Sequence, residues 1–246
     1  MSASPPSAAL RVEGVSYAFG KRRALEGVSL TVAEGAFTAL LGVNGAGKTT
    51  LFNLVTRLFD TPDGSIEVCG HDVRRAPTEA LARLGVVFQS RSLDANLTVA
   101  QNVAYQGALH GIATREARAR GEELMARMGL AERMGDKVRA LSGGQARRAE
   151  IASALIHRPR LLLCDEATVG LDVAARAAIV DDIHRLAAED GVGVLWATHL
   201  VDEIAPDDPV VVLHRGRVLV ADGAGSIAGD RGLAEAFLDL TGEVAA

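Results

Sequence analysis

Positions 42–49 read Gly-Val-Asn-Gly-Ala-Gly-Lys-Thr, and this stretch decides the fold. Its glycines allow backbone N–H groups to curl around a phosphate chain, where a Cβ atom would obstruct them. The apolar run at 37–41 predicts a buried strand before the loop, and the amphipathic segment at 50–55 predicts a helix after it. The loop pattern alone is expected by chance in roughly one chain in a hundred of this length. The strand–loop–helix context therefore indicates an α/β protein that binds a nucleotide.

Four side chains in and beyond this loop are suited to a polyphosphate and its metal ion. Lys48 would supply a positive charge to the β- and γ-phosphates, and the Thr49 hydroxyl would ligate Mg²⁺. The apolar run at 161–164 predicts a strand buried on both faces, which ends in Asp165 and Glu166. We expect Asp165 to hold Mg²⁺ and Glu166 to accept a proton from the attacking water. Two acids after a strand often only cap the next element, so this motif is weak by itself.

Positions 141–145 read Leu-Ser-Gly-Gly-Gln, and two interpretations of them are open. Ser142 can be an ordinary helix N-cap with two glycines in the first turn. Alternatively, Ser142 and the amides of Gly143 and Gly144 form an anion site, because the helix dipole points its positive end at them. A further apolar run, at 192–197, ends near His199, a residue that is structural in most such places and gains weight only from the other motifs.

The order of these motifs resembles that of the ATP-binding subunit of ABC transporters, over nearly the whole chain. The matching segments are Gly42–Thr49 as Walker A, Gln89 as the Q-loop, 141–145 as the signature motif, 161–166 as Walker B, 170–172 as the D-loop and His199 as the switch histidine. Segments 96–102 and 168–172 resemble exporter-type, ABC-2-like subunits that pair with a separate membrane subunit. The run at 194–204 also resembles subunits associated with pyrroloquinoline-quinone-dependent alcohol oxidation systems.

The resemblance implies a P-loop NTPase α/β fold of the ABC-ATPase type. A RecA-like core with a mixed and parallel sheet would carry an N-terminal antiparallel β subdomain and an α-helical subdomain. One ATPase domain would cover residues 1–246, divided into the ATP-binding core with its antiparallel β subdomain at 8–98 and 156–225, the helical subdomain at 99–155, and a C-terminal helix and tail at 226–246.

The resemblance also implies a role for each matching residue. Catalysis falls to Glu166, His199 and Gln89, and Mg²⁺ binding to Thr49, Gln89 and Asp165. We choose Phe19, which precedes Gly20, over Tyr17 as the ring that stacks on adenine; the other aromatic would pack into the core. The nucleotide-binding residues are then Phe19, Gly42, Asn44, Gly45, Ala46, Gly47, Lys48, Thr49, Thr50, Ser142, Gly143, Gly144, Gln145 and Asp172.

The family's mechanism implies partners as well as a ligand. Each ATP would lie between the Walker A loop of one subunit and the signature loop of another, which makes a two-fold homodimer. Hydrolysis would separate the subunits and power transport, with export favoured, and Gln89 would report the state of the site to an integral membrane permease. The chain would then lie at the cytoplasmic face of the cell membrane.

Composition limits the alternatives. The chain has 246 residues, 48% of them hydrophobic, and a net charge of −5, which suits one compact domain and argues against a nucleic-acid surface. No apolar run has the length of a membrane span, and residues 1–7 read as a frayed tail rather than a signal peptide. A soluble ABC-type ATPase of DNA repair or translation is the alternative, but those proteins need a coiled coil or a second ATPase module.

Hydrophobic patterns predict the remaining elements. Alternation predicts antiparallel strands at 10–17, 28–32 and 66–69, and an apolar run predicts a strand ending at Gln89. Helical patterns cover most of 99–155, and further helices are expected at 174–189 and 232–240. Residues 210–220 read as a hairpin with Gly216 in its turn.

Overall fold

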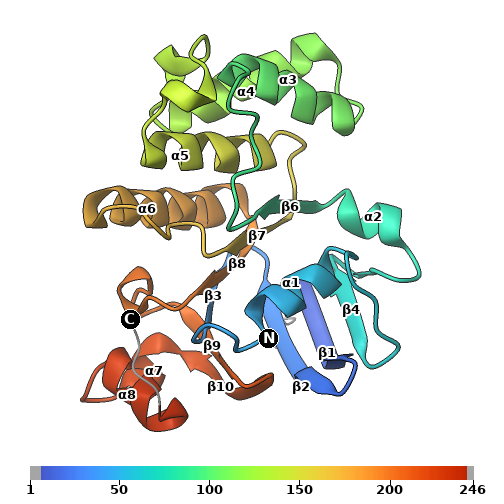
Figure 1. Cartoon of the computed structure of the whole chain (residues 1–246), viewed down its shortest axis with the longest axis vertical. Helices are drawn as coiled ribbons and strands as arrows, with labels where there is room; N and C mark the ends of the chain where they lie inside the picture. The colour runs from blue at the N-terminus through green and yellow to red at the C-terminus, as the bar shows by residue number, and fades with distance from the viewer. Residues whose placement is uncertain (1–6, 243–246) are drawn as a thin grey trace, which may run out of the picture.

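The structure is a computed structural model that describes residues 7–242. The expected frayed start, apart from Ser7, and the last four residues of the predicted tail lie outside that range. The described chain forms two sheets, a group of helices packed beyond one face of the larger sheet, and a C-terminal helical pair, as Figure 1 shows.

The larger sheet has six strands and carries the phosphate-binding loop. Its strands are β3 (Phe37–Leu41), β6 (Leu84–Val87), β7 (Leu161–Asp165), β8 (Gly193–Thr198), β9 (Pro209–His214) and β10 (Arg217–Gly223), in the spatial order β10-β9-β3-β8-β7-β6. Only β10 runs antiparallel to its neighbour. Leu41 pairs with Thr198 and Asp165 with Ala197, so the residues that follow β3, β7 and β8 meet at one edge of the sheet.

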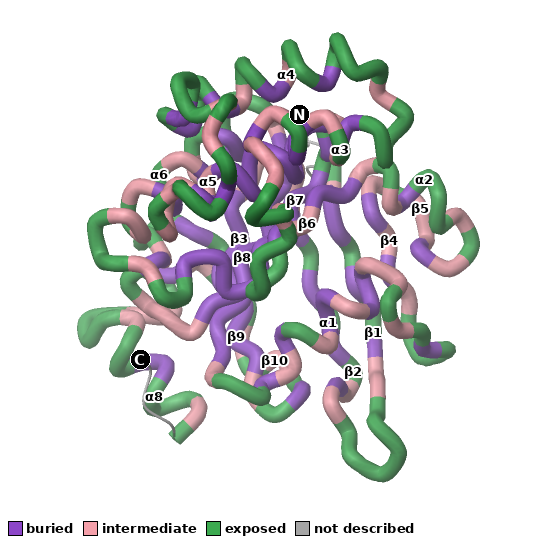
Figure 2. The backbone as a smooth tube through the Cα atoms, turned by 45° about the horizontal axis from the view of Figure 1, so that its top comes forward, coloured by how far each residue is buried: buried purple, intermediate pink, exposed green. Residues whose placement is uncertain are grey.

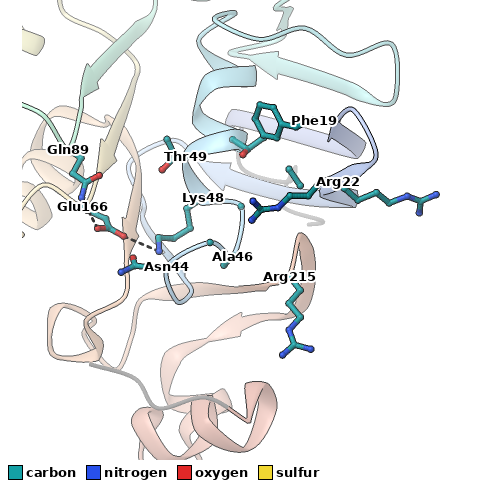
Figure 3. A pocket seen from close by; sticks show the side chains of 14 residues that line it. Phe19, Arg22, Asn44, Ala46, Lys48, Thr49, Gln89, Glu166 and Arg215 are labelled. Atoms are coloured by element: carbon teal, nitrogen blue, oxygen red, sulfur yellow. Dashed lines mark hydrogen bonds and ion pairs between the residues drawn. The ribbon is translucent and has the colours of Figure 1, made fainter.

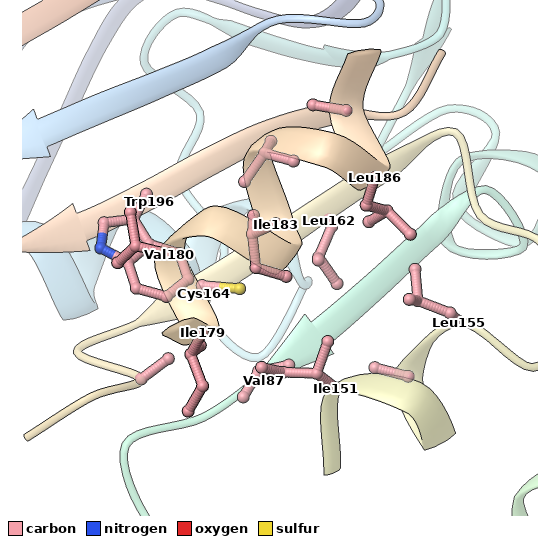
Figure 4. Packing of buried hydrophobic residues seen from close by; sticks show 14 of the residues in the cluster. Val87, Ile151, Leu155, Leu162, Cys164, Ile179, Val180, Ile183, Leu186 and Trp196 are labelled. Carbon is pink, nitrogen blue, oxygen red and sulfur yellow. The ribbon is translucent and has the colours of Figure 1, made fainter. Parts of the chain in front are cut away.

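Both faces of the central strands of this sheet are covered, which explains why β3, β7 and β8 are almost entirely apolar. Every residue of β3, β7 and β8 is buried. Helix α6 (Val173–Asp190) covers one face with Ile179, Ile183 and Leu186, which pack over Leu162 and other strand residues in Figure 4. Helix α1 (Lys48–Val55) covers the other face, in a second cluster shared with the smaller sheet.

The smaller sheet is antiparallel and presents one hairpin tip towards the loop. Its strands are β1 (Ala8–Phe19), β2 (Arg22–Ala33), β4 (Ser65–Val68) and β5 (His71–Asp72), in the order β2-β1-β4-β5. Phe19 pairs with Arg22 across the turn at Gly20 and Lys21, and Gly20 has φ +59°, as a tight hairpin turn requires. The short helix α2 (Pro77–Leu81) follows this sheet.

The helices of the middle of the chain form a separate layer. They are α3 (Val99–Leu109), α4 (Thr114–Arg127), α5 (Gly143–Ala154) and the 3₁₀ turns η1 (Ala131–Arg133) and η2 (Val138–Ala140). Figure 2 shows that α4 exposes most of its outer face, whereas the strands below are buried. Residues 99–155, all of them described, contribute no strand to either sheet.

The expected elements are present, with differences at two places. The strand expected to end at Gln89 is β6, which ends at Val87, because the carbonyl oxygens of Phe88 and Gln89 accept hydrogen bonds from Arg147 instead of from a neighbouring strand. The C-terminal segment contains α7 (Ala224–Ala228), which the sequence pattern does not indicate, in addition to the expected helix, α8 (Leu233–Thr241). Among residues 7–242, no helix combines the length and apolar character needed to cross a bilayer.

Candidate functional site

A pocket of ≈ 580 Å³ surrounds the phosphate-binding loop at the carboxyl edge of the large sheet (Figure 3). Every residue of the range 44–50 lines it, together with Phe19, Gln89 and Glu166. The volume lies within the range of small-molecule sites in proteins. The fold therefore brings together residues from the first hairpin, the loop after β3 and the segments after β6 and β7.

Close packing within the protein requires two of the loop's glycines. A Cβ atom on Gly42 would lie 2.5 Å from the carbonyl oxygen of Leu213. Gly47 has φ +115°, and a Cβ atom there would lie 2.7 Å from Cδ2 of Leu25. These glycines thus hold the loop against β9 and β2, in addition to leaving its amides accessible to an anion.

Lys48 is paired within the protein. Its ammonium nitrogen donates a hydrogen bond of 2.5 Å to the carbonyl oxygen of Gly42 and lies 3.1 Å from Oε1 of Glu166. The two side chains are only 4% and 9% exposed. A buried cation and a buried carboxylate in contact stabilise each other, and either one left alone would be costly.

The three residues expected to be catalytic meet at one carboxylate. Nε2 of Gln89 donates to Oε2 of Glu166 at 3.4 Å, and Nδ1 of His199 lies 3.3 Å from Oε1 of Glu166. Figure 3 shows Gln89 and Lys48 directed at Glu166 from opposite sides. Glu166 has φ +48°, a conformation that costs a non-glycine residue free energy and persists where the surroundings fix it.

Asp165 and Thr49 offer oxygen atoms suited to a hard divalent cation. The Thr49 side chain hydrogen-bonds to Asp165, and burial raises the pKa of the Asp165 carboxyl above its usual range. Oδ1 of Asp165 is buried and has no hydrogen-bond partner. A hydroxyl beside an unsatisfied carboxylate oxygen, at the mouth of a phosphate-binding loop, is a donor set that fits Mg²⁺.

The segment 142–145 does not line this pocket. Ser142 caps α5, where its hydroxyl accepts from the amide of Gln145 while the Gln145 side chain accepts from the amide of Ser142. Asp172 likewise caps α6 by accepting from the amide of Ala175. The cap interpretation of Ser142 is confirmed, and the phosphate contacts expected of 142–145 and Asp172 stay predictions.

Phe19 lies at the pocket and Tyr17 packs behind it. Phe19 is 49% exposed, and it meets the rings of Tyr17 and Phe59 edge-on at centroid distances of 5.0 and 5.6 Å. Tyr17 is stacked on Phe59 and joins the core cluster. An exposed ring held by two others is well placed to stack on a base.

Three arginines that the sequence analysis did not name among the site residues line the pocket. Arg22 and Arg23 follow the hairpin turn after Phe19, and Arg215 lies in the β9–β10 turn. All three are exposed, so they add positive charge at the rim of a site for an anionic ligand. The run at 21–23 next to Phe19 could have indicated the first two, whereas no local pattern points to Arg215.

A buried ion pair on α5 holds the segment after β6. Arg147 donates to the carbonyl oxygens of Phe88 at 2.8 Å and Gln89 at 2.9 Å, and also to Glu150 at 2.8 Å. Glu150 in turn accepts from the amide of Ser92 at 2.7 Å. The helix that begins at the signature segment is therefore attached directly to the backbone that carries Gln89.

The fold and the pocket define a P-loop nucleotide-binding protein, and comparisons with known proteins narrow this class. The sequence model of the family described as "ABC transporter" matches residues 25–169. The chain is 38% identical over 250 residues to the daunorubicin resistance ATP-binding protein DrrA3 of Streptomyces coeruleorubidus, an alignment that covers 95% of this chain and 79% of that protein.

Two further similarities agree with this match. The methionine import ATP-binding protein MetN of Caulobacter vibrioides is 41% identical over 214 residues, or 85% of this chain and 64% of MetN. The solved structure of cbiO1 from Clostridium perfringens, described as part of the ABC transporter complex cbiONQ, has a TM-score of 0.83 and 27% identity. That alignment covers 94% of this chain and 95% of cbiO1.

The chain belongs to the ABC transporter family and is an ATP-binding subunit of such a transporter. Members of this family hydrolyse ATP, so the chain is an ATPase. None of these similarities bears on the narrower resemblance of 194–204 to subunits of quinone-dependent alcohol oxidation systems, which stays a prediction.

Proposed function

We propose that this chain is an Mg²⁺-dependent ATPase that powers export through an ABC transporter. Two copies of the chain form a homodimer. The homodimer binds an integral membrane permease at the cytoplasmic face of the cell membrane. The contacts of Glu166 with Lys48, Gln89 and His199 carry the proposal. They place a carboxylate, a cation and two polar side chains beside a phosphate-binding loop, as hydrolysis of a phosphoanhydride requires.

The chain's own residues suggest the order of events. Lys48 exchanges its contact with Glu166 for the terminal phosphates of ATP, which frees Oε1 of Glu166 to accept a proton from water. Gln89 and His199 then orient that water and the γ-phosphate from either side of Glu166. Thr49 and Asp165 would hold Mg²⁺, which would supply positive charge that neutralises the phosphates.

The homodimer is supported by the position of the signature segment. Ser142 and its neighbours lie outside the pocket of their own chain, although the start of α5 is partly exposed and electrostatically suited to an anion. Val169 and Val173, on either side of 170–172, are 42% and 70% exposed. A second copy whose ATP meets Ser142 would cover this surface in an isologous contact.

Chromatography of the Glu166→Gln variant tests the dimer. The variant keeps the shape of the site but cannot take the proton, so with ATP and Mg²⁺ it should elute as a dimer while the parent stays monomeric. The matched control, Lys48→Ala combined with Glu166→Gln, should stay monomeric because it lacks the phosphate-binding cation. A Glu166→Gln variant that remains monomeric at saturating ATP would argue against the ATP-bound pair.

Export is favoured by the similarity to the daunorubicin resistance protein, because that alignment covers nearly the full length of this chain. The alignment with the daunorubicin resistance protein leaves about a fifth of that protein unmatched, whereas the chain spans less than two thirds of the methionine importer. Purification with the tagged chain from solubilised membranes tests the partner and the direction. We expect a stoichiometric integral membrane protein and ATP-driven export after reconstitution; copurifying DNA or ribosomes would support the soluble alternative.

A further inference from the structure

The residues around the sole tryptophan form a buried hydrogen-bond network that the proposed mechanism does not yet use. Glu203 ends the 3₁₀ turn η3 (Val201–Glu203), four residues after His199, and is 3% exposed. Its Oε2 accepts a hydrogen bond of 2.9 Å from the indole nitrogen of Trp196, and its Oε1 accepts from the hydroxyl of Thr168. Trp196 and Thr168 are 0% and 1% exposed.

The network joins two segments that carry catalytic side chains. Trp196 lies on β8, three residues before His199, and Thr168 lies two residues after Glu166. The backbone oxygen of Thr168 accepts from the amide of Leu171, so Thr168 also begins the turn that leads to Asp172. One carboxylate thus connects the segment after the switch histidine, the segment after the general base and the predicted D-loop.

A buried carboxylate at the position of Glu203 is energetically unfavourable. Both of its donors are uncharged side chains, and burial of a carboxylate is unfavourable unless good hydrogen bonds offset it. Apolar packing would stabilise the same region with less desolvation. The carboxylate, however, accepts two directed bonds from two different segments, and directed bonds fix relative position better than apolar contacts do.

We propose that Glu203 is a positioning residue that fixes His199 relative to Glu166 and to the D-loop. The Glu203 carboxylate holds the two segments in register, so that the imidazole stays 3.3 Å from Oε1 of Glu166. Movement of either segment on ATP binding changes the hydrogen bond to Trp196. This inference rests on the proposed roles of Glu166 and His199.

Glu203→Ala removes both hydrogen bonds and should lower kcat about 10- to 100-fold, the effect expected from displacement of a catalytic group. The KM for ATP should stay within about twofold, because the phosphate-binding loop is not touched. Glu203→Gln should restore most of the kcat, since its amide can accept from Trp196 and donate to Thr168. Thr168→Val, which keeps the shape of the side chain, should lower kcat through the loss of one bond.

The matched control is Asp202→Ala, the neighbouring acid of the same 3₁₀ turn. Asp202 pairs with Arg176 at 2.9 Å and is 57% exposed. Its loss should leave kcat unchanged, because the pair lies at the surface and fixes neither His199 nor Glu166.

Fluorescence gives a second readout that a merely structural role would not change. Trp196 is the only tryptophan of the chain, so its emission reports on the Glu203 contact. ATP should shift the emission of the parent and of Asp202→Ala, but not that of Glu203→Ala. If Glu203→Ala does not fold, the kcat of Thr168→Val and its ATP-dependent emission change decide the question.

The outcomes separate this inference from the proposed function. If the parent hydrolyses ATP and Glu166→Gln does not, a parental kcat in both Glu203→Ala and Thr168→Val overturns the positioning role alone. An equal rise of KM and fall of kcat would also overturn it, because the network would then act on ATP binding. A parent without ATPase activity, or a fully active Glu166→Gln, would overturn both.

Discussion

Nζ of Lys48 lies 3.1 Å from Oε1 of Glu166, and both side chains are nearly inaccessible to solvent. The residue proposed to bind phosphate and the residue proposed to take the proton are therefore partners of each other. A phosphate group that attracts Lys48 releases Glu166 at the same moment. In the proposed mechanism, the Glu166 carboxylate would become free to accept a proton once a phosphate group binds Lys48.

Replacement of Lys48 by Ala should abolish ATP turnover. The ammonium group is the one charged side chain directed into the loop from α1, and loss of such a preorganised group costs about 10²- to 10³-fold in rate. Phosphate release from ATP measures the effect. Lys21→Ala is the control, since Lys21 lies in the exposed hairpin turn outside the pocket lining; a folded Lys48→Ala protein with the parental rate would contradict the assignment.

Replacement of Phe19 by Ala should raise the KM for ATP about tenfold or more, because stacking of a base on an aromatic ring contributes about 1–3 kcal/mol. The kcat should change little, since the ring would contact the base and not the phosphates. Phe19→Tyr keeps a ring on the same supporting cluster and should behave like the parent. An unchanged KM in Phe19→Ala would show that the base lies elsewhere.

Replacement of Arg147 by Ala should destabilise the protein by about 3–5 kcal/mol, because Glu150 would be left buried without its partner. The two side chains are 8% and 2% exposed. Arg148 provides the control: it lies 3.4 Å from Asp182 and is 27% exposed, so Arg148→Ala should cost about 0–1 kcal/mol. Urea unfolding of both variants measures the difference, and equal losses would rule out a special role for the Arg147 pair.

His157 should make the protein lose stability as the pH falls below about 6.5. Burial, and then the nearby His110, lower the pKa of His157 from 6.5 to about 4, and the two rings stack at 3.7 Å. Between pH 6.5 and 4 the unfolded chain binds the proton and the folded chain does not, so protonation favours unfolding. His157→Gln should flatten the pH dependence of the unfolding free energy within that window.

Protonation of His184 should change the free energy of unfolding in the opposite direction, so His184 serves as the comparison. The hydrogen bond to Asp208 raises the pKa of His184 above 6.5, and its stabilising effect is therefore present below pH 6.5 and lost as the pH rises through the higher folded value. His184→Gln should lower the unfolding free energy at pH 5 to 6 without changing its slope there. A flattened slope between pH 4 and 6.5 in His184→Gln, but not in His157→Gln, would reverse the assignment.

Local patterns were sufficient to predict the elements that build the large sheet. Apolar runs of four to six residues marked β3, β7 and β8, because strands buried on both faces are almost entirely apolar. The loop at 42–49 could be recognised because its backbone geometry depends on glycines at fixed spacing. Short elements such as β5 and α7 were not predicted, since two to five residues carry no measurable period.

Contacts between distant segments could not be read from the sequence. The sequence pattern placed Arg147 and Glu150 only within a helical segment, yet they hold the backbone some 58 residues upstream. Glu203 and Thr168 are 35 residues apart in the sequence and meet because β8 lies beside β7 in the sheet. The Gln89 strand ended two residues early for the same reason, because a side chain of α5 replaced a strand as the partner of its carbonyl groups.

The rate of ATP hydrolysis by Glu166→Gln tests the central claim most directly. The substitution preserves the size of the side chain and its capacity to accept from Gln89, so ATP should bind as tightly as to the parent. Phosphate release should fall at least about hundredfold, because the amide cannot take the proton from water. Undiminished binding together with lost hydrolysis is the result that this account predicts. Hydrolysis at the parental rate, in a variant that still binds ATP, would contradict it.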